Sequence, residues 1–217
     1  MRTYIAPLGF DSRRVVRPVL SEGLDAGDQV LLLQPATGSE RGDDAFDEVK
    51  DVLTQVVPDL DLDTEMLPYS DFVETTLYCT DLIQASKGET IVILGGGARE
   101  LLFPLTVATF TSTDDVDTIL QVGDIDSSVR RIPQLNLRGN VSDAEAGLLA
   151  DLDTLQTPLS ISEIASELEK SKSTIARHVG SLESEGFVKT VKQGRSKKVS
   201  LTDSGRIFLS TQSEKLI

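Results

Sequence analysis

Apolar and polar residues follow two different patterns along the chain, one up to about residue 139 and another beyond it. In the first part, short apolar runs alternate with segments in which apolar residues recur every three or four positions. The runs predict strands at residues 3–8, 29–35, 62–67, 90–96 and 117–123. The segments between them predict a helix capped by Asp11 and further helices over 44–57, 71–85 and 98–110.

This alternation of mostly apolar strands with helices is typical of an open, doubly wound α/β domain, in which helices cover both faces of a mostly parallel sheet. A further strand is predicted from Arg130, in the segment RRIPQLNLRG, and leads out of the sheet. We therefore expect one α/β domain over residues 1–139.

Beyond residue 139 the pattern predicts helices that follow one another closely. Ser142 with Glu145, and Ser160 with Glu163, have the spacing of capping boxes, and Ser171 is placed to cap a third helix. Residues 187–202 then alternate like a hairpin that turns at Gln193-Gly194, and a last helix follows. This order predicts a winged helix-turn-helix domain over residues 140–217.

The helix predicted after Ser171 is amphipathic. Ile175, Val179 and Leu182 fall on one face, which leaves small, polar and basic residues outside. Such a face fits a major groove of DNA, while basic residues of the wing suit phosphates. The candidate DNA-binding residues are Lys172, Ser173, Thr174, Arg177, His178 and Ser181 of the helix, with Arg195, Ser196, Lys197 and Lys198 of the wing. The alternatives are a protein-interaction module and, for His178, a partly packed residue without chemistry.

Two loops of the first domain are predicted at the same edge of its sheet, because both follow parallel strands. Three glycines join a strand to a helix in the second loop, where backbone N–H groups and the helix N-terminus favour a phosphate. The phosphate motifs of P-loops and dinucleotide sites are absent, since no Lys-Ser or Lys-Thr follows and Glu100 occupies the last glycine position. The candidate ligand-binding residues are Leu8, Gly9, Phe10, Asp11, Ser12 and Arg13, with Gly95, Gly96, Gly97, Ala98 and Arg99. For the first loop, a plain strand-to-helix turn is an equal alternative.

Charge sharpens this picture. The net charge of the chain is -14, and residues 1–142 hold 11 Lys and Arg against 24 Asp and Glu. Such acidity is typical of halophilic proteins, with a basic partner as the alternative. Residues 170–198, in contrast, hold eight Lys and Arg against two Glu.

One cysteine and one histidine exclude a disulfide framework and His-rich metal sites, so we expect no metal, no cofactor and no catalytic residue. Neither a signal peptide nor a membrane span is predicted, which favours a cytoplasmic location.

Two resemblances cover the chain. SKSTIARHVGSLESEGFV, from Ser171, resembles the recognition-helix signature of MarR and related archaeal winged-helix regulators, although Glu169 and Lys170 stand where those families usually carry a glycine and an apolar residue. PLGFDSRRVVRPVL and GGGARELLFPLTVA resemble the CARF domain, a CRISPR-associated Rossmann-like sensor, with Ala98 in place of its signature threonine. Together they resemble a family of archaeal CRISPR-associated transcriptional regulators.

That resemblance implies a homodimer whose CARF domains share one cyclic oligoadenylate on the two-fold axis, with cyclic tetra-adenylate as the favoured ring. It also implies a ligand-responsive regulator that binds double-stranded promoter DNA of CRISPR-associated genes and is not an enzyme. Two alternatives stay open: a ring nuclease that cleaves the cyclic oligoadenylate, and a regulator that senses an unrelated nucleotide or metabolite. The ring nuclease would lack a histidine in its sensor domain for proton transfer.

Overall fold

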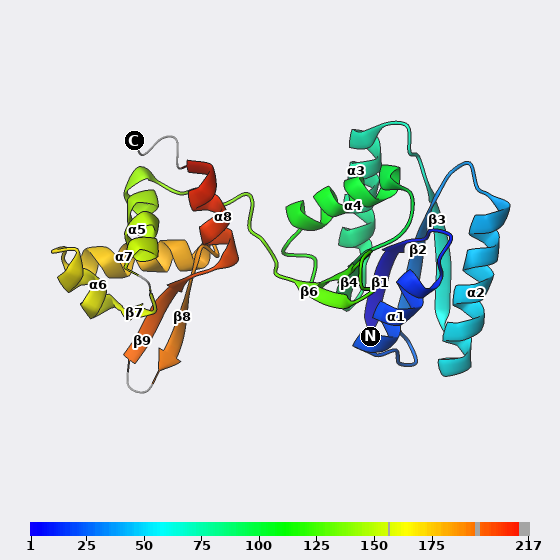
Figure 1. Cartoon of the computed structure of the whole chain (residues 1–217), viewed down its shortest axis with the longest axis horizontal. Helices are drawn as coiled ribbons and strands as arrows, with labels where there is room; N and C mark the ends of the chain where they lie inside the picture. Colours follow the sequence, from blue (N-terminus) through cyan, green and yellow to red (C-terminus); the bar gives the residue numbers. More distant parts are fainter. Residues whose placement is uncertain (156, 194–195, 213–217) are drawn as a thin grey trace. The chain divides into compact units, whose positions relative to one another are not determined.

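The chain is described by a computed structural model that covers residues 1–155, 157–193 and 196–212. It consists of two compact units, Met1–Gln134 and Leu135–Ile217, each with its own hydrophobic core (Figure 1). The predicted fold class is confirmed: a mostly parallel α/β unit is followed by a winged-helix unit.

The first unit contains a six-stranded sheet in the order β3-β2-β1-β4-β5-β6. Strands β1 to β5 run parallel, and β6 pairs antiparallel with β5, from Ile119 opposite Ile132 to Val122 opposite Val129. The elements are β1 Arg2–Pro7, α1 Arg13–Glu22, β2 Gln29–Pro35, α2 Glu40–Val56, β3 Asp61–Leu67, α3 Phe72–Ala85, β4 Glu89–Leu94, α4 Arg99–Thr111, β5 Thr118–Val122 and β6 Val129–Ile132.

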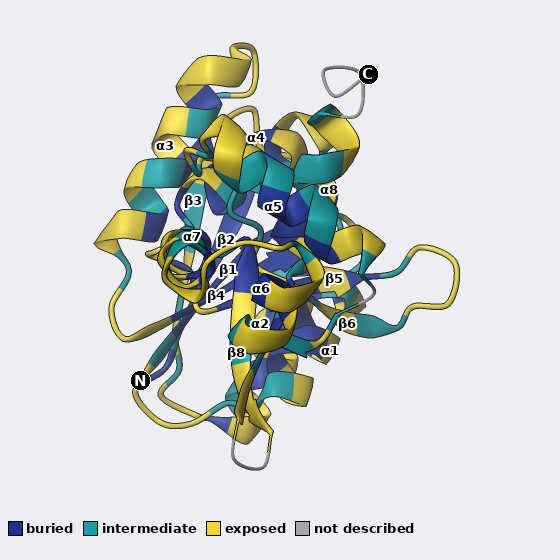
Figure 2. Ribbon diagram, turned by 90° about the vertical axis from the view of Figure 1, so that its left-hand side faces the viewer, coloured by how far each residue is buried: buried dark blue, intermediate teal, exposed yellow. Residues whose placement is uncertain are grey.

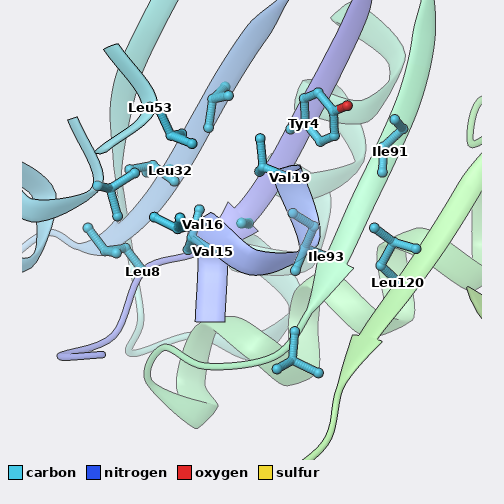
Figure 3. Close-up of a cluster of buried hydrophobic side chains, with 14 of the residues drawn as sticks. Tyr4, Leu8, Val15, Val16, Val19, Leu32, Leu53, Ile91, Ile93 and Leu120 are labelled. Atoms are coloured by element: carbon cyan, nitrogen blue, oxygen red, sulfur yellow. The ribbon is translucent and has the colours of Figure 1, made fainter. Parts of the chain in front are cut away.

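Helices cover both faces of this sheet. On one face, Val15, Val16 and Val19 of α1 and Leu53 of α2 pack against side chains of the central strands such as Tyr4 (Figure 3). On the other face, the buried residues come from α3 and α4. The central strands β1, β2 and β4 are buried over almost all of their length (Figure 2), as the continuous apolar runs predicted.

Two helices of this unit begin elsewhere than predicted. Helix α1 begins at Arg13 with Ser12 in the N-cap position, but the Ser12 side chain makes no capping hydrogen bond. The Asp11 carboxylate instead accepts from the Arg13 amide at 3.2 Å, as expected of a capping Asp11, and the Arg14 amide donates to the Asp11 carbonyl at 3.1 Å. Helix α2 begins at Glu40, four residues earlier than expected, and Ser39 caps it by accepting from the Gly42 amide. Its first turn contains no apolar residue, so hydrophobic periodicity does not reveal it.

The second unit has the predicted order of helices and hairpin, and its elements are α5 Asp143–Thr154, β7 Leu159–Ser160, α6 Ile161–Glu167, α7 Lys172–Ser184, β8 Val188–Gln193, β9 Ser196–Leu201 and α8 Asp203–Gln212. Its small sheet has the order β7-β9-β8. Both predicted capping boxes form, at Ser142 and at Ser160. Helix α7 buries Ile175, Val179 and Leu182 as expected. The predicted turn residue Gly194 lies outside the described residues.

The segment that joins the units belongs to the second one, so the units divide after Gln134 and not after residue 139. The Asn136 amide donates to the Ser204 hydroxyl at 3.0 Å, and the Asn136 side chain donates to the Glu185 carbonyl at 2.9 Å. Strand β6 correspondingly ends at Ile132. A side chain and a backbone carbonyl of the winged-helix unit therefore hold a segment that the sequence predicted as part of a strand.

Glu169 lies in the turn between α6 and α7 with φ of 52°, in the left-handed region that favours glycine. A residue with a side chain is strained in this conformation by about 1–2 kcal/mol. Replacement by glycine would remove this strain, but glycine also has more conformational freedom in the unfolded chain, which offsets part of the gain. We expect Glu169→Gly to stabilise the winged-helix unit by about 0.5–1 kcal/mol. Slower amide hydrogen exchange in α7 would measure this gain. Glu167→Gly, at the last residue of α6 and without a positive φ, is the control and should lose up to about 1 kcal/mol; equal losses for both variants would contradict the prediction.

Candidate functional site

A cavity of about 700 Å³ lies at the carboxyl edge of the first unit's sheet. It sits where the strand order reverses, with β2 on one side of β1 and β4 on the other, which is the usual ligand position in open α/β sheets. The loops after β1, β2, β4 and β5 line it, through Leu8, Gly9, Phe10, Asp11, Arg14, Gln34, Pro35, Thr37, Gly38, Ser39, Arg41, Gly42, Gly96, Gly97, Ala98, Arg99, Leu102 and Asp124.

Glycines allow two of these loops to touch. A Cβ on Gly9 would lie 2.7 Å from the Gly97 amide nitrogen, and a Cβ on Gly97 would lie 2.6 Å from Cβ of Pro7. Gly96 and Gly97 also have positive φ, of 99° and 73°. The β1–α1 and β4–α4 loops therefore pack backbone against backbone, directly before the N-terminus of α4.

Arginines meet carboxylates at this cavity. Arg14 is paired with Asp124, its Nη1 lying 2.5 Å from Oδ1, and its Nε lies 3.8 Å from an oxygen of Asp11. Arg41 and Arg99 have no carboxylate within ion-pair distance in the described part of the chain. Two unpaired guanidinium groups in so acidic a domain make the cavity suited to an anion.

Most of the ligand-binding residues predicted from the sequence line this cavity, but Ser12, Arg13 and Gly95 do not. Ser12 is buried at the start of α1, and Arg13 points to solvent, where it pairs with Asp11 and helps to lower the pKa of that carboxyl. Gly95 has a packing role, because a Cβ there would lie 2.5 Å from the Val122 side chain.

The β2–α2 loop and Asp124 were missed as parts of the site. Thr37 and Ser39 belong to this loop and Arg41 to the first turn of α2, and all three line the cavity. The sheet topology could have indicated this loop, because β2 is parallel to β1 and the loops that follow both strands therefore lie at the same edge of the sheet. Arg14, the last residue of the PLGFDSRR segment, lines the cavity too.

The second unit presents an exposed basic face on α7. Lys172, Ser173, Arg177 and Ser181 are exposed there, while Thr174 and His178 are half-buried. His178 Nδ1 lies 3.9 Å from a carboxylate oxygen of Glu145, so the imidazole ring of this α7 residue faces α5. The pKa of Glu145 falls to about 2, mainly because the Ser142 side chain hydrogen bonds to it and then because the Ser181 side chain does.

The wing lysines differ from one another. Lys197 is exposed and has no ion-pair partner among the described residues, whereas Lys198 is 21% exposed and its Nζ lies 2.6 Å from Glu163 of α6. This contact is the largest cause that lowers the pKa of Glu163 to about 2. Lys198 thus ties the wing to the helix-turn-helix. Ser196 is exposed, and Arg195 lies outside the described residues.

An exposed apolar face covers part of α3 and α4. Phe72, Val73 and Leu77 of α3 and Phe103 of α4 are each more than half exposed. Tyr69, Phe72 and Phe103 also line a smaller hollow with Arg99, which therefore borders both this face and the anion cavity. Phe72 of α3 and Phe103 of α4 thus meet at this hollow, and large exposed apolar patches are a common feature of interaction surfaces.

In the described part of the chain, no helix is long and apolar enough to cross a membrane, and no cluster of His, Cys, Asp or Glu is placed to hold a metal ion.

These features define a two-domain protein in which a Rossmann-like unit with an arginine-lined cavity precedes a winged-helix unit. The model of the Csa3 CRISPR-associated Rossmann-like domain matches residues 2–129, and the chain belongs to this family. The model of the DUF6293 C-terminal winged helix domain matches residues 150–213. No curated protein sequence matches the chain.

Solved structures that resemble the chain include MepR, a transcription regulator of the Staphylococcus aureus multidrug efflux pump MepA, with 21% identity, 35% of this chain and 57% of that chain covered, and a TM-score of 0.32. FabT of Streptococcus pneumoniae in complex with DNA has 23% identity, 36% and 59% coverage and a TM-score of 0.31. YusO of Bacillus subtilis has 29% identity, 32% and 51% coverage and a TM-score of 0.30. The chain thus spans only 51% to 59% of the length of these structures.

Proposed function

We propose that this protein is a transcriptional regulator of CRISPR-associated genes that binds promoter DNA through its winged-helix unit and responds to a cyclic oligoadenylate bound by its Rossmann-like unit. The observation that carries the proposal is the anion cavity, with Arg41 and Arg99 unpaired, in a chain whose other unit exposes a basic helix. A phosphate ligand and a DNA phosphate backbone are the anions that these two surfaces fit.

The glycine loop supports phosphate as the ligand group. Gly96 and Gly97 bring their backbone to the cavity wall without side chains, and α4 begins two residues later. The partial positive charge of a helix N-terminus stabilises an anion there. Arg99, the first residue of α4, adds a full charge at the same place.

The apolar face of α3 and α4 supports a homodimer. A second copy that covers Phe72, Leu77 and Phe103 in an isologous interface would bring both copies of Arg99 towards the two-fold axis, since Arg99 borders this face. A symmetric ring of phosphates would then contact the same residues in each subunit. The relative orientation of the two winged-helix units would depend on the ligand, which is the coupling that a ligand-controlled regulator requires.

The proposal is tested by incubation of the purified protein with cyclic tri-, tetra- and hexa-adenylate. Calorimetry measures binding, chromatography detects linear products, and sedimentation gives the oligomeric state. Binding of the tetra-adenylate to a dimer without products supports the regulator, whereas linear products would make the protein a ring nuclease. Binding of none of the three rings, or a monomer in every sample, would contradict the proposed sensor.

Arg177 is expected to read a base, because it lies on the exposed face of α7 between the buried positions Ile175 and Val179. Arg177→Ala should weaken binding to the preferred promoter site by about 1–3 kcal/mol and leave binding to unrelated DNA almost unchanged. Titration of both DNAs at one salt concentration measures the difference. Equal weakening on both DNAs would show that Arg177 contacts only the backbone.

Lys197 is expected to contact a phosphate, whereas Lys198 is occupied by Glu163. Lys197→Gln should weaken binding to all sequences and flatten the slope of log affinity against log salt by about 0.9 per lost contact in each subunit. Lys198→Gln is the matched control and should change this slope less. A larger change of slope for Lys198→Gln would mean that DNA displaces Glu163.

A further inference from the structure

Phe10 and Arg41 form a contact across the cavity that phosphate binding does not explain. Phe10, in the β1–α1 loop, is 58% exposed, and the Cζ atom of Arg41 lies 4.0 Å above the centre of its ring. Both residues line the cavity. An aromatic ring and a guanidinium plane are the two kinds of side chain on which unpaired nucleobases stack.

The position of Arg41 is unfavourable for the helix that carries it. Arg41 is the second residue of α2, where the partial positive charge of the helix N-terminus repels a cation. Acidic neighbours, Glu40 and Asp43, share this first turn, yet neither lies within ion-pair distance of Arg41. Local stability therefore does not account for an arginine here.

The backbone of Arg41 is held in place. Gln34, which is buried, donates from Nε2 to the Gly42 carbonyl at 3.0 Å, and the Ser39 hydroxyl accepts from the Gly42 amide at 3.0 Å. A Cβ on Gly42 would lie 3.0 Å from that hydroxyl, so the turn is closely packed. The start of α2 thus presents the Arg41 side chain to Phe10 from a fixed point.

We infer that Phe10 and Arg41 form a stacking site for one nucleobase of the bound oligonucleotide and determine its preference for purines. This inference rests on the proposed function. Because the Arg41 guanidinium lies only 4.0 Å from the Phe10 ring, no base fits between them, and the base stacks on the face of the ring that Arg41 leaves uncovered. The phosphates lie at Arg99 and the glycine loop of the same cavity. A purine offers the larger ring system to such a site, so adenine is favoured over uracil.

The test measures affinities of the full-length protein for cyclic tetra-adenylate and cyclic tetra-uridylate. Phe10→Leu keeps an apolar side chain but removes the aromatic ring; it should weaken tetra-adenylate binding at least tenfold and reduce the preference for adenylate over uridylate. Phe10→Tyr retains the ring and should stay within about threefold of the parent, since its stacking surface is the same. Arg41→Ala should also weaken tetra-adenylate binding, and Arg17→Ala, at an exposed arginine of α1 that does not line the cavity, is its control for loss of charge.

The outcomes separate the two claims. If the parent binds tetra-adenylate and Phe10→Leu keeps both its affinity and its base preference, the inferred stacking role of Phe10 is wrong, but the proposed binding of a cyclic oligoadenylate is supported. If the parent binds neither ring, the proposed function fails and the stacking site fails with it. Equal weakening of adenylate and uridylate binding by Phe10→Leu would assign Phe10 a structural role and overturn the inference.

Discussion

Gly97→Ala should destabilise the Rossmann-like unit by about 3 kcal/mol. The new Cβ would lie 2.6 Å from Cβ of Pro7 and 3.2 Å from its carbonyl carbon, so the two loops must separate. Forcing extra atoms into a packed site costs about 1–3 kcal/mol. The positive φ of 73° adds about 1–2 kcal/mol for any residue with a side chain.

Denaturation followed by tyrosine fluorescence measures this loss. Tyr4, Tyr69 and Tyr78 all lie in the Rossmann-like unit, and the chain contains no tryptophan, so the signal reports this unit alone. Gly27→Ala is the matched control, because Gly27 has φ of 89° but open space around it. It should lose about 1 kcal/mol, the backbone part only. Equal losses for the two variants would show that the loops separate without cost.

Arg99→Ala should weaken binding of cyclic tetra-adenylate by about 1.5–3 kcal/mol, the usual range for a hydrogen bond to a charged group. Arg99 lines the cavity at the start of α4 and has no ion-pair partner in the described part of the chain, so removal should leave folding unchanged. Calorimetric titration of the full-length protein measures the change, and the melting curve checks the fold.

Arg13→Ala tests whether the ligand binds in the cavity or at the full set of residues predicted from the sequence, which includes Arg13. Both arginines were expected at the ligand, but Arg13 is 80% exposed, pairs with Asp11 and does not line the cavity. Ligand affinity should therefore fall for Arg99→Ala and stay almost constant for Arg13→Ala. The reverse order would contradict the assignment of the cavity.

The fold was predictable because strong local patterns agreed with one another. Continuous apolar strands indicated a sheet covered on both faces, and the capping boxes at Ser142 and Ser160 marked the starts of two helices of the second unit. The glycines at 95–97 pointed to the sheet edge at which the cavity lies, where a Cβ on Gly95 would come within 2.5 Å of Val122 and a Cβ on Gly97 within 2.6 Å of Pro7.

The remaining parts of the site depend on contacts between distant residues. Asp124 lies at the cavity because it pairs with Arg14, 110 positions away in the chain. The early start of α2 leaves no apolar signal, so Arg41 looked like part of a polar loop. Lys198 and Lys197 are neighbours of the same type, and only the pairing of β9 with β7 places Lys198 beside Glu163. Sequence periodicity contains none of these relations.

The packing of Gly9 on Gly97 also affects how fast a ligand can enter. The β1–α1 and β4–α4 loops share this contact and form one rigid wall, whereas no hydrogen bond joins described residues 36–42 to that wall. Arg41 over Phe10 links the two sides, and an exposed contact of this type is worth about 0.5–1 kcal/mol, which thermal motion breaks often. The Arg41 side chain can thus leave the Phe10 ring while its backbone stays in place, so entry of a ligand requires no movement of a loop, and diffusion rather than rearrangement of the site would set the association rate.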